Sequence, residues 1–176
     1  MFNEVGVRIV SNPSAPAPNK VVYTYTFPVG SPVAGVITMD YRLGGADGAS
    51  AAFDAADYAH LYTSVGDPLV LSLGLGGTAL FTFDLQASMV QATNTATVLA
   101  GSVGSFTSGD YTADFAFNNV VVTLGSDYPL SGSMIFTTTA FELELTYDGD
   151  NTAELAVGGV LRYIVNLDDG TLTEVV

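Results

Sequence analysis

Apolar and polar side chains alternate along most of this chain, and the alternation predicts β-strands rather than helices. Residues 21–27 read VVYTYTF and residues 37–42 read ITMDYR, so one face of each segment is apolar and aromatic. A period of two residues is that of a strand with one buried face. Further segments of this kind, bounded by Gly, Asp, Ser or Pro, are residues 68–74, 78–86, 88–99, 110–117, 119–124 and 133–139.

The C-terminal part predicts a run of hairpins. The strands FELELTY, TAELAV, VLRYIVNL and TLTEV are separated by the turn-forming stretches DGDN, GG and DDG. A two-residue turn at Gly158-Gly159 pairs Val157 with Val160, Leu155 with Arg162, and Ala153 with Ile164. A turn at Gly149-Asp150 pairs Tyr147 with Thr152, and Glu144 with Leu155.

These registers divide the C-terminal hairpins into two faces. The predicted core face consists of Phe141, Leu143, Leu145, Tyr147, Leu161, Tyr163 and Val165. The opposite face consists of Glu142, Glu144, Leu155, Val157, Val160, Arg162 and Ile164. Because the second face mixes charged and apolar residues, we expect another sheet, a helix or another subunit to cover it.

Two segments depart from the alternating pattern. Residues 50–62, SAAFDAADYAHLY, are rich in alanine and predict one short helix with Ser50 as its N-cap. Residues 1–20 predict a short strand, EVGVRIV, followed by an extended linker that contains Pro13, Pro16 and Pro18.

The pattern as a whole predicts one all-β domain over residues 21–176. Consecutive hairpins favour an antiparallel meander of about eight to eleven strands. The meander forms either a β-sandwich or a closed or partly closed β-barrel, with at most the one short helix.

The charge composition of the chain excludes two classes of binding partner. The chain has 18 Asp and Glu against 4 Lys and Arg, a net charge of −14. Nucleic acid is excluded as a partner, because phosphate binding needs clustered cations, and an anionic membrane surface would repel the chain. No run of apolar residues is long enough for a transmembrane helix.

Composition also favours one compartment. The chain has no cysteine, few lysines, and many Thr, Gly and Asp residues, a composition that favours a secreted or cell-envelope protein of a bacterium. The start, MFNEVG, lacks the basic and apolar regions of a signal peptide, so we expect a leader to be absent from this sequence.

Most aspartates stand beside glycine, where they close turns with their own side chains. Asp148, Asp150 and Glu154 are the one oxygen-rich group that could bind calcium, although their spacing is not that of a twelve-residue calcium loop. A plain hairpin turn is the preferred interpretation, and no metal is expected.

Catalytic candidates are few. His60, the only histidine, lies between Tyr58 and Tyr62 and could serve as a general base with a tyrosine or Asp57 nearby. Glu142 and Glu144 share a strand face, with Arg162 as a long-range charge partner, and a carboxylate pair is the minimum for glycoside hydrolysis. A solvated strand face explains the same residues, and Asp40 with Arg42 predicts a surface ion pair.

No cofactor is expected. Gly74, Gly76 and Ala79 fit the loose dinucleotide-binding pattern, but a strand follows them where that pattern requires a helix. The aromatic residues offer a different kind of site, since those at strand positions could line a cavity for a small apolar ligand. They are Tyr23, Tyr25, Tyr41, Phe81, Phe83, Phe115, Phe117, Tyr147 and Tyr163.

Two functional hypotheses follow. The first is a non-enzymatic extracellular or envelope protein with a structural or partner-binding role, which associates with copies of itself or with another surface protein. The alternative is a calyx-like β-barrel that binds a small apolar ligand and cyclises or isomerises it. The shape of the interior, filled or hollow, distinguishes the two.

Overall fold

The computed structural model describes residues 22–26, 32–64, 66–72, 77–123 and 125–175, and for 22–26 it describes the backbone. The predicted strand and linker of residues 1–20 lie outside these ranges, as do Gly74 and Gly76. Within them the chain is all-β, as predicted. Fifteen strands form one antiparallel sheet.

The strands and two short 3₁₀ turns follow one another along the chain. They are β1 (Val22–Thr26), β2 (Val33–Ala34), β3 (Val36–Leu43), β4 (Ala49–Ser50), η1 (Phe53–Ala55), β5 (Tyr58–Tyr62), β6 (Leu69–Ser72), β7 (Thr78–Val90), η3 (Gln91–Thr93), β8 (Thr95–Val98), β9 (Val103–Ser108), β10 (Tyr111–Thr123), β11 (Pro129–Thr137), β12 (Glu142–Tyr147), β13 (Thr152–Val157), β14 (Val160–Asn166) and β15 (Leu172–Glu174).

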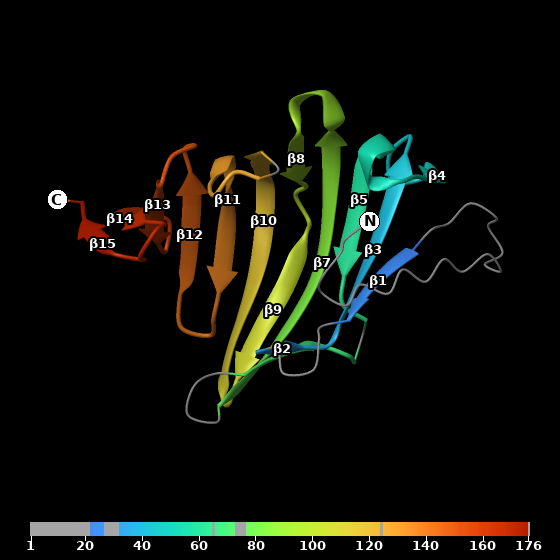
Figure 1. Cartoon of the computed structure of the whole chain (residues 1–176). Helices are drawn as coiled ribbons and strands as arrows, with labels where there is room; N and C mark the ends of the chain where they lie inside the picture. Colours follow the sequence, from blue (N-terminus) through green and yellow to red (C-terminus); the bar gives the residue numbers. More distant parts are fainter. Residues whose placement is uncertain (1–21, 27–31, 65, 73–76, 124, 176) are drawn as a thin grey trace.

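The sheet is a meander along its main path, which visits the strands in the order of the sequence. Its main path runs β1-β3-β5-β7-β8-β10-β11-β12-β13-β14-β15, and the shorter strands β2, β4, β6 and β9 pair beside this path. The long strand β7 pairs with β6 and β9 along its first half and with β5 and β8 along its second half. The arrangement is partly ring-like and is one curved sheet rather than a two-sheet sandwich (Figure 1).

The two faces of this sheet differ sharply in chemistry. Cross-strand partners lie on the same face, so the register assigns each residue to one side. From β3 to β13 every Asp, Glu, Arg and His of the strands lies on one side, which we call the charged face. The other side, the apolar face, includes Met39, Tyr41, Leu61, Phe81, Phe83, Phe115, Phe117, Met134, Phe136, Leu143, Leu145, Tyr147, Leu155 and Tyr163.

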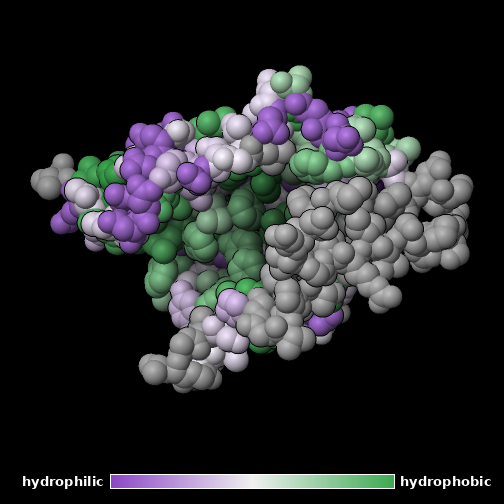
Figure 2. All heavy atoms as spheres, viewed as in Figure 1, coloured by the Kyte–Doolittle hydropathy of each residue, from purple (hydrophilic) through white to green (hydrophobic). Residues whose placement is uncertain are grey.

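Among the described residues, the side chains of the apolar face do not pack into a filled core. Among the described residues, the buried hydrophobic side chains larger than alanine are Tyr58, Leu69, Met89, Phe115 and Val120. Most of the long side chains on the apolar face are only half-buried. Figure 2 shows the same feature as a hollow with hydrophobic side chains inside it. A domain of this size ordinarily encloses a close-packed core.

A small packed cluster covers one end of the apolar face. Ala56, Ala59, Met89 and Ala96 form it, with Tyr41, Ala51, Leu61 and Val122 packed against it. The side-chain amide of Gln91 donates hydrogen bonds to the carbonyls of Phe53 and Ala56, at 2.6 and 2.9 Å, and so holds the η1 segment in place.

The predicted helix over residues 50–62 is wrong. Ser50 lies in β4, η1 is a single 3₁₀ turn, and residues 58–62 form β5. The segment DYAHLY itself has a period of two, and β5 pairs with β3 on one side and β7 on the other. This pairing outweighs the helix propensity of the preceding alanines, because tertiary context overrides intrinsic propensity.

The C-terminal hairpins exist as predicted, but their registers differ. Val157 pairs with Val160 as expected, whereas Leu155 pairs with Tyr163 and Ala153 with Val165. Arg162 is the inserted residue of a β-bulge in β14, which shifts the register by one. The hairpin before it also shifts by one.

In that earlier hairpin Tyr147 pairs with Ala153, and Glu144 pairs with Ala156. Together the two shifts correct the predicted faces. Leu155, Val157 and Val160 belong to the apolar face, and Leu161, paired with Ala156, leaves it. The charged face of these hairpins therefore contains Glu142, Glu144 and Glu154 with fewer apolar neighbours than the sequence predicted. Phe141 precedes β12 and is exposed.

Within the described ranges, no helix has the length and hydropathy needed to cross a membrane.

Candidate functional site

Five phenylalanines form a contact network on the apolar face. The rings of Phe81 and Phe115 stack with centroids 5.1 Å apart and planes 17° apart. Phe83 lies 6.0 Å from Phe81, and Phe117 and Phe136 lie 5.8 and 6.4 Å from Phe115. The strands β7, β10 and β11 place these residues at alternate positions, so every ring points to the same side.

Gly104 makes room for this network. It lies on β9, directly between its cross-strand partners Phe83 and Phe115. A Cβ atom at residue 104 would come within 3.0 Å of Phe115 Cζ, Phe115 Cε2 and Thr82 O, a separation that real Cβ atoms essentially never show. The Phe115 ring thus covers the backbone where β9 has no side chain.

Exposure distinguishes the centre of the network from its margin. Phe115 is 6% exposed, whereas Phe81, Phe83, Phe117 and Phe136 are only half-buried. The half-buried rings present apolar surface on the apolar face of the sheet. Apolar surface of this kind gains free energy when a ligand removes it from water.

The aromatic residues predicted to line a cavity share this face wherever the structure describes their side chains. Tyr41 lies on β3, Tyr147 on β12 and Tyr163 on β14, beside the four predicted phenylalanines. Burial raises the pKa of the Tyr147 hydroxyl, so this residue stays neutral at pH 7. Tyr23 and Tyr25 pair with Met39 and Ile37 through their backbones, and their side chains lie outside the described set.

Sequence reasoning missed Phe136 as a lining residue. It lies within the predicted strand 133–139 and pairs with Phe115 and Leu143. Its alternation with Met134 was the available signal, because the two residues share a strand face.

His60 lies on the charged face with a partner that the sequence did not indicate. His60 Nε2 lies 2.7 Å from Asp84 Oδ1, and its ring is tilted against that of Tyr62 with centroids 4.6 Å apart. Tyr58 is buried and donates a hydrogen bond to Gln86 Oε1 at 2.9 Å. Asp84 comes from β7, and the pairing of β5 with β7 brings the two together.

Asp57, the neighbour expected for His60, has a different role. Its carboxylate accepts hydrogen bonds from the backbone N–H groups of Gly45, at 2.9 Å, and Gly44, at 3.0 Å. These bonds lower the pKa of Asp57. Both glycines have positive φ, and their N–H groups converge on one point. Asp57 therefore fastens the loop after β3.

Arg162, the predicted long-range charge partner of Glu142 and Glu144, forms no salt bridge with either residue in the described part of the chain. Glu142 and Glu144 lie on β12, whereas Arg162 is the bulge residue two strands away on β14. In the described part of the chain, the salt bridges are those of Arg42 with Asp40 and of His60 with Asp84.

Asp40 and Arg42 form an ion pair, but it is not the surface pair that the sequence predicted. Arg42 Nη2 and Nε lie 2.7 and 3.1 Å from Asp40 Oδ2. The Asp40 side chain is 1% exposed and that of Arg42 is 24% exposed. The hydrogen bond to Asp40 raises the pKa of Arg42 further, so this guanidinium remains charged.

The acidic turn proposed for calcium is held by hydrogen bonds of its own. Asp150 Oδ1 accepts bonds from the Thr152 backbone N–H, at 2.8 Å, and from the Thr152 hydroxyl, at 2.7 Å, which lower the pKa of Asp150. No group of three or more acidic or histidine side chains in the described ranges could hold a metal ion. Asp148, Asp150 and Glu154 accordingly do not meet as a ligand set.

Asp168 connects the turns at this end of the sheet. It accepts hydrogen bonds from the Asn151 amide, at 2.9 Å, and from the Tyr128 hydroxyl. Both bonds favour the ionised carboxylate and lower its pKa. The β10–β11, β12–β13 and β14–β15 turns are thereby joined through one side chain.

Comparison with known proteins gives no assignment. No family model, no curated protein and no solved structure matches this chain. Its function is therefore argued from its own residues.

Proposed function

We propose that this protein binds a small, uncharged apolar molecule on the apolar face of its curved sheet. The observation that supports the proposal is the half-buried aromatic network of Phe81, Phe83, Phe117 and Phe136 around the buried Phe115. Binding sites for small molecules are concave, mostly apolar and largely formed before the ligand arrives.

Charge specifies the ligand class. From β3 to β13 the apolar face has no Asp, Glu, Arg or His, so an ionised group of a ligand would find no counter-charge there. An uncharged hydrocarbon or aromatic compound has no ionised group to remove from water when it binds to such a surface. The proposal involves binding alone, since the described strands from β3 to β13 contribute no Asp, Glu, Arg or His to the apolar face.

The Phe136→Gln variant tests this proposal with the uncharged fluorescent probe N-phenyl-1-naphthylamine. Wild-type protein should bind the probe and increase its fluorescence. The substitution places an amide on the apolar face and should weaken probe binding by about tenfold, equivalent to about 1.4 kcal/mol. The measurement is a fluorescence titration, with circular dichroism to confirm that the variant is folded.

Phe141→Gln is the matched control, because Phe141 is 44% exposed and lies outside the network. Its probe affinity should equal that of the wild type. Equal losses in both variants, or no probe binding by the wild type, would count against the apolar face as a binding surface. Probe binding that appears only after removal of residues 1–20 would show that the chain itself occupies the face.

Self-association through the C-terminal edge is the second candidate function. Phe141, Val160, Leu161, Leu172 and Val175 are between 39% and 52% exposed, and all belong to the last four strands and their ends. β15 ends the strand path, so one of its edges has no partner strand within the described sheet. An apolar strand edge of this kind pairs readily with a second copy.

Light scattering after size-exclusion chromatography tests the second candidate. The wild type should form a dimer or larger species, and Leu172→Lys should convert it to a monomer because a charged side chain blocks the edge. Leu43→Lys is the control, since Leu43 is 56% exposed at the far end of β3. A wild-type monomer at every concentration would exclude this association.

A further inference from the structure

The charged face contains a pocket that the proposed function does not use. It has a volume of about 410 Å³ and lies where the β5–β6 connection passes beside β7 and β9. Thr63 and Ser64 line it from the connection, Thr82 and Asp84 from β7, and Val103 and Ser105 from β9. Pockets of roughly 300 Å³ or more accommodate small molecules.

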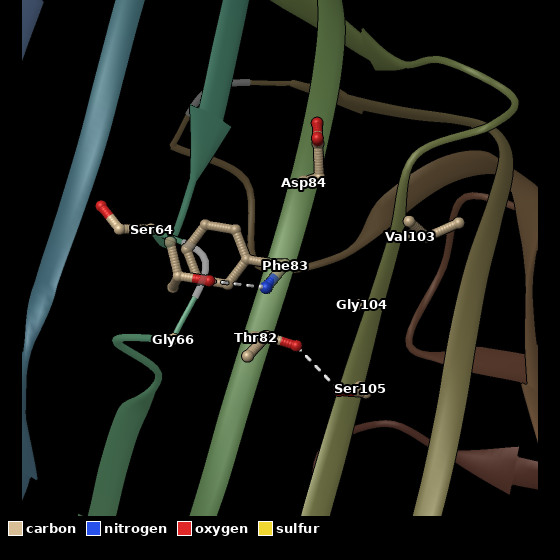
Figure 3. Close-up of a pocket in the computed structure, with 9 residues that line it drawn as sticks. Ser64, Gly66, Thr82, Phe83, Asp84, Val103, Gly104 and Ser105 are labelled. Carbon is tan, nitrogen blue, oxygen red and sulfur yellow. Dashed lines mark hydrogen bonds between the residues drawn. The ribbon is translucent and has the colours of Figure 1, made fainter.

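Hydroxyl groups dominate the polar lining. Thr82 Oγ1 and Ser105 Oγ lie 2.7 Å apart in a mutual hydrogen bond, visible in Figure 3 as a dashed line between β7 and β9. The Thr63 hydroxyl accepts a bond from the Phe83 backbone N–H at 3.2 Å, which leaves its own proton available. Each of these hydroxyls can still donate or accept one more bond.

Asp84 adds a strong acceptor beside the hydroxyls. Its Oδ1 lies 2.7 Å from His60 Nε2, which orients the carboxylate, and its side chain is 56% exposed. Oδ2 is then available to accept a hydrogen bond from a ligand. Hydrogen bonds to an ionised carboxylate are about twice as strong as those between neutral groups.

The residues that line the pocket argue against anions, metal ions and purely apolar molecules as ligands. Among the described residues, an anion would find the Asp84 carboxylate and no Lys or Arg in the lining, because Arg42 is bound to Asp40 and Arg162 lies on β14. A metal ion would find no group of three ligands within the described residues. A purely apolar molecule would leave the hydroxyls and the carboxylate without bonds, which is unfavourable.

We propose that this pocket binds a neutral saccharide. A sugar ring presents hydroxyls that donate to Asp84 Oδ2 and exchange hydrogen bonds with Thr82, Ser105 and Thr63. Its C–H faces are apolar and fit against Val103, whose side chain is 47% exposed. Thr82, Asp84 and Ser105 lie on the charged face, whereas Phe83 and Gly104, which also line the pocket, belong to the apolar face.

Saturation-transfer NMR with the methyl glycosides of glucose, galactose, mannose and N-acetylglucosamine tests this proposal. At least one should bind, with a dissociation constant of about 1 mM as expected for a shallow site. Asp84→Asn should weaken binding at least tenfold, because the amide is a poorer acceptor and no longer orients with His60. Methyl glucuronate should bind more weakly than the corresponding glucoside, because its carboxylate faces Asp84.

Asp110→Asn is the matched control, since it removes the same charge from the exposed turn between β9 and β10. It should leave sugar binding unchanged. The proposal is overturned if none of the four glycosides binds, or if Asp84→Asn binds as well as the wild type while circular dichroism shows both to be folded. Phe136 does not line this pocket, so the Phe136→Gln test of the apolar face and the Asp84→Asn test of the pocket change different residues.

Discussion

Replacing Gly104 by alanine is expected to destabilise the fold by about 3 kcal/mol or more, a larger loss than most single substitutions cause. The added Cβ would overlap the Phe115 ring on one side and the Thr82 carbonyl of the neighbouring strand. The ring is 6% exposed and in contact with Phe81, Phe117 and Phe136, so it has no room to move away. Urea denaturation followed by circular dichroism measures the loss.

Gly101→Ala is the control for this substitution. Gly101 has a φ of +91° and nothing within 4 Å of an added Cβ, so alanine there introduces backbone strain without overlap. The expected loss is about 1 kcal/mol. In a Phe115→Ala background, Gly104→Ala should cost less than in the wild type, because one of the two overlaps is gone. Equal losses for Gly104→Ala and Gly101→Ala would contradict the packing described.

Replacing Arg42 by methionine is expected to cost about 3 kcal/mol, the second large effect. Methionine keeps the apolar length of the side chain but removes the guanidinium that faces the buried carboxylate of Asp40. Losing one partner of a buried charge typically costs roughly 3–5 kcal/mol, and the partial exposure of Arg42 puts this pair at the lower end. Arg42 also donates to the Ala46 carbonyl, so the loop after β3 loosens as well.

Two comparisons isolate the charge effect. Arg162→Met removes an exposed cation and should change the free energy of unfolding by about 0.5 kcal/mol or less. In an Asp40→Asn background, Arg42→Met should cost much less than 3 kcal/mol, because the buried partner is no longer charged. If Arg42→Met and Arg162→Met have equal effects, the buried ion pair contributes nothing to stability.

The two substitutions concern different faces of the same sheet. Gly104 and Phe115 determine how closely β9 approaches β10 beneath the aromatic network. Asp40 and Arg42 lie on the charged face of β3. Among the described residues, the fold therefore has local packing at a few points rather than one filled core.

The fold class was predictable from the sequence because it depends on local signals. A period of two along the strands and turn residues between them identify an antiparallel meander without knowledge of distant contacts. The same pattern placed Phe81, Phe83, Phe115 and Phe117 on apolar strand faces. It could also have shown that DYAHLY, the end of the predicted helix 50–62, alternates as a strand.

The candidate sites were less predictable, because they depend on which strands pair and in which register. The bulge at Arg162 shifts Leu155 and Ala153 by one position and so changes their pairing partners. A bulge depends on how the strand bends and twists. The Gly158-Gly159 turn therefore does not indicate that a bulge follows at Arg162. The mixed second face, from which self-association was first predicted, came largely from this register error and from the shifted β12–β13 hairpin.

The sequence by itself determined an acidic all-β chain with one uncharged set of strand positions, since alternation and composition are properties of neighbouring residues. Only the tertiary structure decided that Asp84 meets His60, that Asp40 is buried with Arg42, and that Gly104 lies under Phe115. The contacts of Asp84 with His60 and of Gly104 with Phe115 join different strands. Asp40 and Arg42 lie on one strand, and their burial depends on how the sheet curves around β3. Side chains on separate strands come within contact distance only after pairing and curvature are fixed, and no local pattern encodes either.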